Sequence, residues 1–127
     1  MTELTKAEEQ IMQVLWRLEK AVVKDVIEKL PTPKPAYNTV STIIRILEKK
    51  GFVSHKAFGK TYEYFPLIAR DEYKKKFLKS FISRYFGNSF QEMVSFFAIR
   101  RDVSLEELEE IRNLLEEEIV KQKGKEK

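Results

Sequence analysis

The chain contains 127 residues, enough for one ordinary domain or two small ones, and its 43% hydrophobic and 35% charged residues are typical of a soluble globular protein. It has no cysteine and one histidine, His55, which excludes disulfides, cysteine-based metal sites and any site that needs two histidines, so we expect no metal and no cofactor. No apolar run approaches the ~18 residues that span a bilayer, and the N-terminus is unlike a signal peptide, so we expect a cytoplasmic protein without membrane insertion.

Two amphipathic helices are predicted before residue 31. Thr5 and Glu8 have the spacing of a capping box, in which each side chain accepts a hydrogen bond from the other residue's backbone N–H. The apolar residues that follow recur at helical spacing: Ile11, Met12, Leu15, Trp16 and Leu18, then Val23, Val26, Ile27 and Leu30. Residues 31–35 cannot continue a helix, because the alternating prolines lack N–H donors and restrict their neighbours. We therefore expect a rigid turn there.

A third helix is predicted at about residues 36–50. Its apolar stripe is Val40, Ile43, Ile44 and Leu47, and Gly51 follows, where a helix end favours a residue that tolerates positive φ. At about 100° per residue, the opposite face holds these polar side chains: Asn38, Ser41, Thr42, Arg45 and Lys49. Short polar groups and long cations suit the base edges and phosphates of a DNA major groove. The same residues would also suit a solvated helix face.

A two-stranded ribbon is predicted next, with strands at 52–56 and 61–65 and a turn at 57–60 that contains Gly59. Helix, helix, turn, helix and ribbon is the order of a winged helix-turn-helix domain, with residues 57–61 as the wing. Between residues 34 and 60 there are six basic side chains and one acidic one, a net charge of +5 against +4 for the whole chain. This concentration of charge predicts a footprint for phosphate, with Lys60 at the wing tip.

From residue 70 the sequence predicts a module of about three helices. Ser89 and the Ser104–Glu107 pair mark two helix starts, and the tail from about residue 121 is expected to be disordered. Six of the nine phenylalanines follow residue 70, and a module this small has too little interior to bury them.

We therefore predict two domains, a winged-helix DNA-binding domain at 1–69 and a dimerisation domain at 70–127. The apolar residues expected in the dimer contact are Phe77, Phe81, Tyr85, Phe90, Phe96, Phe97, Leu108, Ile111 and Leu115. The alternative is that these aromatic side chains pack back on the N-terminal domain in one core.

Five short segments then stand in an order and spacing that is specific as a set. They are Leu4-Thr5-Lys6-Ala7-Glu8, Val14-Leu15-Trp16, Asn38-Thr39-Val40-Ser41-Thr42, Arg45-Ile46-Leu47-Glu48-Lys49-Lys50-Gly51 and Tyr62-Glu63-Tyr64. With the glycine at Phe86-Gly87 and the final acidic helix, they make the chain resemble the penicillinase repressor (BlaI/MecI) family of bacterial regulators over about residues 4–121.

The resemblance implies a homodimeric transcriptional repressor that binds a palindromic DNA operator through its winged helix. It implies that Thr39, Ser41, Thr42 and Arg45 contact DNA. The helical pattern selects three of these and places Thr39 nearer the side of the helix, where a residue in the first turn could serve a phosphate.

Two departures from the family pattern concern the signal that releases the repressor from DNA. The family's repressors of β-lactamase genes are inactivated by proteolysis at an Asn-Phe bond, where this chain has Ser95 and Phe96, and Asn88 lies in the preceding break. The resemblance thus implies Ser95–Phe96 as the candidate release site and a membrane sensor protease as a candidate partner, although the asparagine is missing. The Cys-x-Cys pairs of a copper-responsive branch are absent, which argues against metal sensing of that kind.

A winged helix can also serve protein–protein contact without specific DNA binding, since a fold does not dictate a function. The charge between residues 34 and 60 argues against that alternative. An enzyme is not expected, because His55 has no partner pattern for a nucleophile and base, and the paired acids near residue 107 resemble a solvated helix face.

Overall fold

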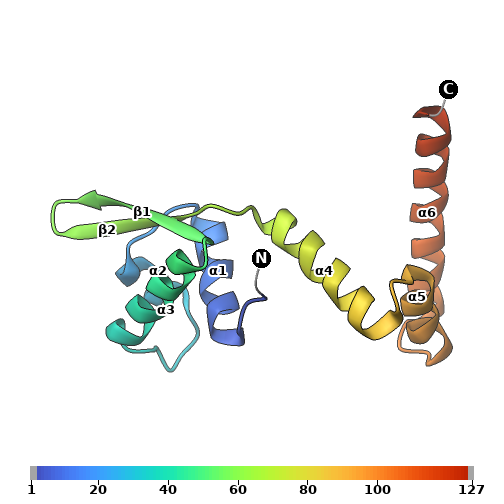
Figure 1. Ribbon diagram of the computed structural model, residues 1–127. Helices are drawn as coiled ribbons and strands as arrows, with labels where there is room; N and C mark the ends of the chain where they lie inside the picture. The colour runs from blue at the N-terminus through green and yellow to red at the C-terminus, as the bar shows by residue number, and fades with distance from the viewer. Residues whose placement is uncertain (1–2, 126–127) are drawn as a thin grey trace. The chain divides into compact units, whose positions relative to one another are not determined.

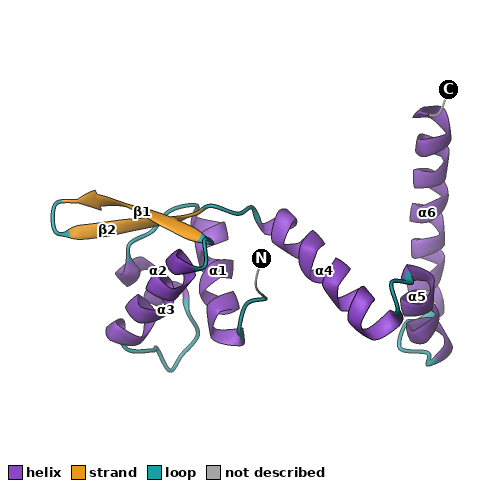
Figure 2. Cartoon of the chain, in the orientation of Figure 1, coloured by secondary structure: helices purple, strands orange, loops and turns teal. Residues whose placement is uncertain are grey.

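The computed structural model describes residues 3–125, which form six α-helices and two β-strands (Figures 1 and 2). The elements are α1 (Lys6–Leu18), α2 (Val23–Lys29), α3 (Tyr37–Lys49), β1 (Val53–Phe58), β2 (Thr61–Pro66), α4 (Arg70–Phe86), α5 (Phe90–Ile99) and α6 (Leu105–Lys125). The chain divides into two compact units that meet between Leu78 and Lys79. Among the described helices, none is both long and apolar enough to cross a membrane. The predicted class, mainly α with a small β-ribbon, is confirmed.

The helix starts follow the capping signals in the sequence. Thr5 and Glu8 form the predicted capping box, with the Glu8 backbone N–H donating to Thr5 Oγ1 and the Thr5 backbone N–H donating to Glu8 Oε1. Ser104 and Glu107 make the same exchange before α6, and Ser89 caps α5. By contrast, α2 and α3 begin after Val22 and Ala36 with no side-chain cap, so their first N–H groups are left for other partners.

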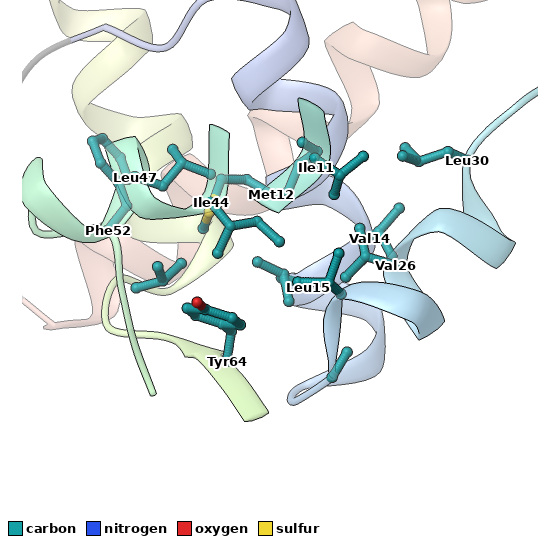
Figure 3. Close-up of a cluster of buried hydrophobic side chains, with 14 of the residues drawn as sticks. Ile11, Met12, Val14, Leu15, Val26, Leu30, Ile44, Leu47, Phe52 and Tyr64 are labelled. Atoms are coloured by element: carbon teal, nitrogen blue, oxygen red, sulfur yellow. The ribbon is translucent and has the colours of Figure 1, made fainter. Parts of the chain in front are cut away.

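The core of the first unit lies where the apolar stripes of α1, α2 and α3 meet the base of the ribbon (Figure 3). The predicted stripe residues are buried or half-buried, and Met12, Leu15, Ile44, Leu47 and Phe52 have no exposed surface at all. Phe52 enters this core directly after Gly51, whose φ of +86° ends α3 and redirects the chain into β1. The stripe pattern alone therefore predicted which face of each helix is turned inward.

The ribbon is antiparallel, with Val53 paired to Pro66 and Phe58 paired to Thr61. Strand pairing thus continues through Ala57 and Phe58, so the predicted four-residue turn is in fact the two residues Gly59 and Lys60. Gly59 has a φ of +61°, which a tight two-residue hairpin requires and a glycine adopts without strain.

A third segment joins the ribbon. The Ala21 backbone N–H donates to the Tyr64 carbonyl at 2.9 Å, and the Tyr64 N–H donates back to the Ala21 carbonyl at 2.8 Å. A single bridge of this kind produces no periodic pattern of apolar residues, so it could not be predicted from the sequence. It ties the residues before α2 to β2.

The first turns of α4 belong to the core of the first unit. The Tyr73 hydroxyl accepts a hydrogen bond from the Leu4 backbone N–H at 3.0 Å, and its ring packs 5.9 Å from that of Trp16. Phe77 packs beside Tyr73, at 6.2 Å between ring centroids. The two compact units therefore meet inside α4 and not at residue 70, where the sequence placed the boundary, and Phe77, expected in the dimer contact, lies with the first unit.

The second unit, from Lys79 onward, buries none of its described residues. Its aromatic side chains touch one another in a chain of ring contacts from Phe81 through Phe86 to Phe96 and Phe97. Large apolar side chains nevertheless remain exposed to solvent. Among them, Ile99 is 79% exposed and Val120 is 69% exposed. Within this single chain, the unit lacks an interior of its own.

The predicted disorder from about residue 121 is wrong for residues 121–125, because α6 continues to Lys125. Lysine, glutamate and glutamine are good helix formers, and Gln122 donates to Glu118 across one turn. Lys123 and Lys125 lie in the last turn, where cations interact favourably with the negative end of the helix dipole. Residues 126 and 127 of that predicted tail lie outside the described residues.

Candidate nucleic-acid interface

The outward face of α3 is polar and cationic. Val40, Ile44 and Leu47 point into the core, and the opposite side of the helix is therefore turned to solvent. The predicted residues on that side are exposed, except Ser41, which is half-buried: Asn38, Thr39, Ser41, Thr42, Arg45 and Lys49. Three of them, Thr42, Arg45 and Lys49, line a shallow depression together with Ile46.

Ile46 was missed by the sequence reasoning, which placed it neither in the apolar stripe of this helix nor on its polar face. It is 41% exposed and lies among the polar groups of the outward face. An apolar side chain in that place is suited to contact with the methyl group of a thymine.

An ion pair fixes the C-terminal end of α3 against the start of α1. Lys50 Nζ lies 3.0 Å from Glu8 Oε1 and 2.8 Å from Glu8 Oε2, and Glu8 is only 4% exposed. Burial by itself raises the pKa of Glu8, but the hydrogen bonds from Lys50 and Thr5 outweigh that effect and hold the pKa below its usual value. The buried carboxylate thus stays ionised and keeps α3 in place.

A second contact links α3 to the ribbon. His55 Nδ1 on β1 lies 2.5 Å from Glu48 Oε2, and the His55 ring packs on Tyr62, with 4.4 Å between their centroids. These contacts hold β1 and β2 at a set place relative to α3. Lys60 then lies exposed in the two-residue turn at the end of the ribbon, as the sequence predicted.

A hollow of about 490 Å³ lies where α2, α3 and the wing meet, and we refer to it as the α2–α3–wing hollow. Of the predicted site residues, it brings together Ser41, Arg45 and Lys60. It also includes Lys24, Tyr37, Thr61 and Tyr62, which sequence reasoning missed. Lys24 lies outside the basic segment from 34 to 60, and the bridge between Ala21 and Tyr64 holds the start of α2 beside β2.

The residues expected in the dimer contact lie mostly on open surface of the second unit. Tyr85, Phe90, Phe96, Phe97, Ile111 and Leu115 are exposed, and Phe81 and Leu108 are half-buried. The Arg100 guanidinium lies 3.8 Å from the centroid of the Phe96 ring, which covers one face of that ring with a cation.

The candidate release site, Ser95–Phe96, lies inside α5, where Ser95 is half-buried and Phe96 is 40% exposed. A protease binds its substrate as an extended strand, so a cut at this bond requires local unwinding of the helix.

The helical core, the outward polar face of α3 and the paired strands with a basic tip together define a winged helix-turn-helix protein. The family described as penicillinase repressor matches residues 4–117 of the chain. Because that match spans most of the sequence, the chain belongs to the penicillinase repressor family.

Two relatives extend over nearly the whole chain. The methicillin resistance regulatory protein MecI of Staphylococcus aureus (strain N315) is 32% identical over 114 residues, which cover 89% of this chain and 93% of MecI. The penicillinase repressor of Bacillus licheniformis is 29% identical over 116 residues, covering 91% of each protein. A solved structure described as the DNA binding domain of the repressor BlaI is 28% identical, with a TM-score of 0.49, and covers 55% of this chain and 87% of that one.

Proposed function

We propose that this protein is a transcriptional repressor that binds double-stranded DNA with α3 in the major groove and the wing against the backbone. The observation that carries the proposal is the outward face of α3. Its exposed polar residues stand on a helix whose other side is buried in the core, so their positions are set by a rigid element. Membership of a repressor family supports the same function.

The side chains on this face divide by their chemistry. Asn38 and Thr42 offer short hydrogen-bonding groups, and Arg45 can hold a guanine through two parallel hydrogen bonds. Lys49 and Lys60 are exposed point charges that suit phosphates. Thr39 lies in the first turn of α3, whose uncapped N–H groups favour an anion.

We further propose that two copies bind together as a homodimer on a palindromic operator. In support, the second unit buries none of its described residues and exposes large apolar side chains, which a second copy would cover. A stable dimer links two DNA-binding domains. Once one domain is bound to its half-site, the other domain is held at a high effective concentration near the second half-site. A two-fold symmetric protein then selects a two-fold symmetric DNA sequence.

Protection mapping on the DNA that flanks the protein's own coding region tests this function. We expect two protected half-sites related by two-fold symmetry, with a binding constant that falls steeply as salt rises. Equal affinity for the protected fragment and for random duplex DNA would contradict specific binding. A failure to bind either duplex would favour the alternative of a protein–protein interaction module.

A further inference from the structure

The α2–α3–wing hollow carries positive charge from three different elements. Lys24 comes from α2, Arg45 from α3 and Lys60 from the wing, and no aspartate or glutamate lines the hollow. Side chains that carry a hydroxyl, those of Ser41, Thr61 and three tyrosines, complete the polar lining. We propose that this hollow holds one phosphate of the DNA backbone, and that Lys24, Tyr37 and Tyr62 are DNA contacts in addition to the outward face of α3. This inference rests on the proposed function.

Within residues 3–125, no acidic side chain is found paired with a cation of the hollow. Ion pairs join Lys50 to Glu8 and Lys74 to Asp71, and His55 contacts Glu48, but none of these contacts involves a cation of the hollow. The acid nearest in sequence to Arg45 is Glu48, and His55 already engages it. Like charges that converge without a counter-charge repel one another, and an anion bound between them removes that repulsion.

Two of the three tyrosines of the hollow, Tyr37 and Tyr62, are not part of the core. Tyr37 is 58% exposed and Tyr62 is 51% exposed, although Tyr64, two residues further along β2, is almost fully buried. The Tyr62 ring is held by its contact with His55, so its hydroxyl has a defined position. A phenolic hydroxyl held in this way donates a hydrogen bond to a phosphate oxygen at little cost in side-chain entropy.

Three structural details bring these groups together. The bridge between Ala21 and Tyr64 fixes the residues before Lys24 beside β2. Lys60, Thr61 and Tyr62 are consecutive residues that follow Gly59 of the tight turn. Tyr37 opens α3, where no side chain caps the first N–H groups, so the helix end adds a favourable field for an anion.

The test compares two lysines of the same helix. Lys24 lies in the hollow, whereas Lys29, in the last turn of α2, is exposed and outside it. Lys24→Ala should weaken binding about fivefold at 0.15 M salt, since one phosphate contact contributes a slope of about −0.9 to the dependence of log affinity on log salt. The loss should be the same on the protected operator and on random duplex DNA. Lys29→Ala changes the net charge equally and should leave affinity and slope unchanged.

Two further variants distinguish the loss of a DNA contact from a defect in folding. Lys24→Arg should retain binding near that of the wild type, and Tyr62→Phe should weaken binding to both duplexes while the ring contact with His55 is kept. Circular dichroism on each variant should match the wild type. An unchanged salt slope for Lys24→Ala, with operator binding intact in the wild type, would overturn this inference and leave the proposed function standing. Absence of DNA binding in the wild type would instead overturn the proposed function.

An inorganic phosphate titration at constant ionic strength distinguishes DNA from a free anion. We expect phosphate to displace the protein from random duplex DNA no more than chloride does. Displacement specific to phosphate, present in the wild type and lost in Lys24→Ala, would assign the hollow to a free phosphate compound and overturn its assignment to the DNA backbone.

Discussion

Arg45 lies in the middle of the outward face of α3 and lines both the shallow depression there and the α2–α3–wing hollow. We expect Arg45→Ala to weaken operator binding by roughly 1–3 kcal/mol and to relax base preference at one position in each half-site. Arg17→Ala serves as the control. Arg17 is exposed near the end of α1, carries the same charge and lines neither the depression nor the hollow. Equal loss of binding on operator and random DNA would reassign Arg45 to a phosphate.

Glu8 makes the stability of the first unit depend on pH. Because its pKa is lowered in the folded state, its contribution is present above its ordinary pKa and is lost as pH falls through the folded value. Glu8→Gln should therefore lower the free energy of unfolding by about 1–3 kcal/mol at pH 7, since Lys50 loses a charged partner. At pH 3 the difference from the wild type should shrink.

Urea denaturation at both pH values measures this effect. Glu9→Gln is the matched control, because Glu9 is the exposed neighbour of Glu8 in the first turn of α1. A difference between Glu8→Gln and the wild type that is as large at pH 3 as at pH 7 would show that lost packing, and not the ion pair, is responsible.

The wing differs from α3 in how it can contact DNA. Lys60 lies in a two-residue turn, where no helix aims it at a base. Lys60→Ala should weaken binding about equally on all sequences and reduce the salt slope by about one unit. The measurement is fluorescence anisotropy with labelled duplexes over a range of salt concentrations. An unchanged slope would mean that the wing tip does not touch DNA.

The junction between the two units, inside α4, determines which fragment of the chain can fold. A fragment of residues 1–69 lacks Tyr73 and Phe77, which pack on the core of the first unit, whereas 1–78 keeps both. We expect the 1–78 fragment to be a folded monomer and the 1–69 fragment to be less stable by roughly 3–5 kcal/mol, as for loss of a large buried aromatic. The full chain should be a dimer.

Sedimentation equilibrium and thermal unfolding of the three proteins test this division. A tightly dimeric 1–78 fragment would contradict the assignment of dimerisation to the second unit. Equal melting temperatures for the two fragments would contradict the role of Tyr73 and Phe77.

Release from DNA also concerns the whole molecule, because a cut inside α5 would separate α4 from α6 and so break the proposed dimer contact. Ser95 replaces the asparagine of the family's cleaved bond and lies within a helix. We expect mass spectrometry of the protein from induced cells to show no fragment that ends at Ser95. Such a fragment would contradict this expectation. An intact chain after full derepression would point to a ligand or a partner protein as the signal.

The helices and strands of the first unit, and the face of α3 turned to solvent, could be predicted from the sequence. This was possible because helix stripes, capping boxes and strand alternation are local patterns: Val40, Ile44 and Leu47 show which side of α3 is buried, whatever surrounds it. The helical course of residues 121–125 was also within reach, since it follows from ordinary helix propensity.

The contacts between residues far apart in the sequence could not be predicted in this way and are known from the packed fold alone. Tyr73 and Phe77 follow the ribbon in a helix that looks separate, yet they belong to the core of the first unit, because the hydroxyl of Tyr73 binds Leu4, 69 residues away. Lys24 joins Arg45 and Lys60 because one bridge between Ala21 and Tyr64 folds the start of α2 against β2. Contacts between residues so distant in sequence depend on how whole elements pack, and no local pattern encodes them.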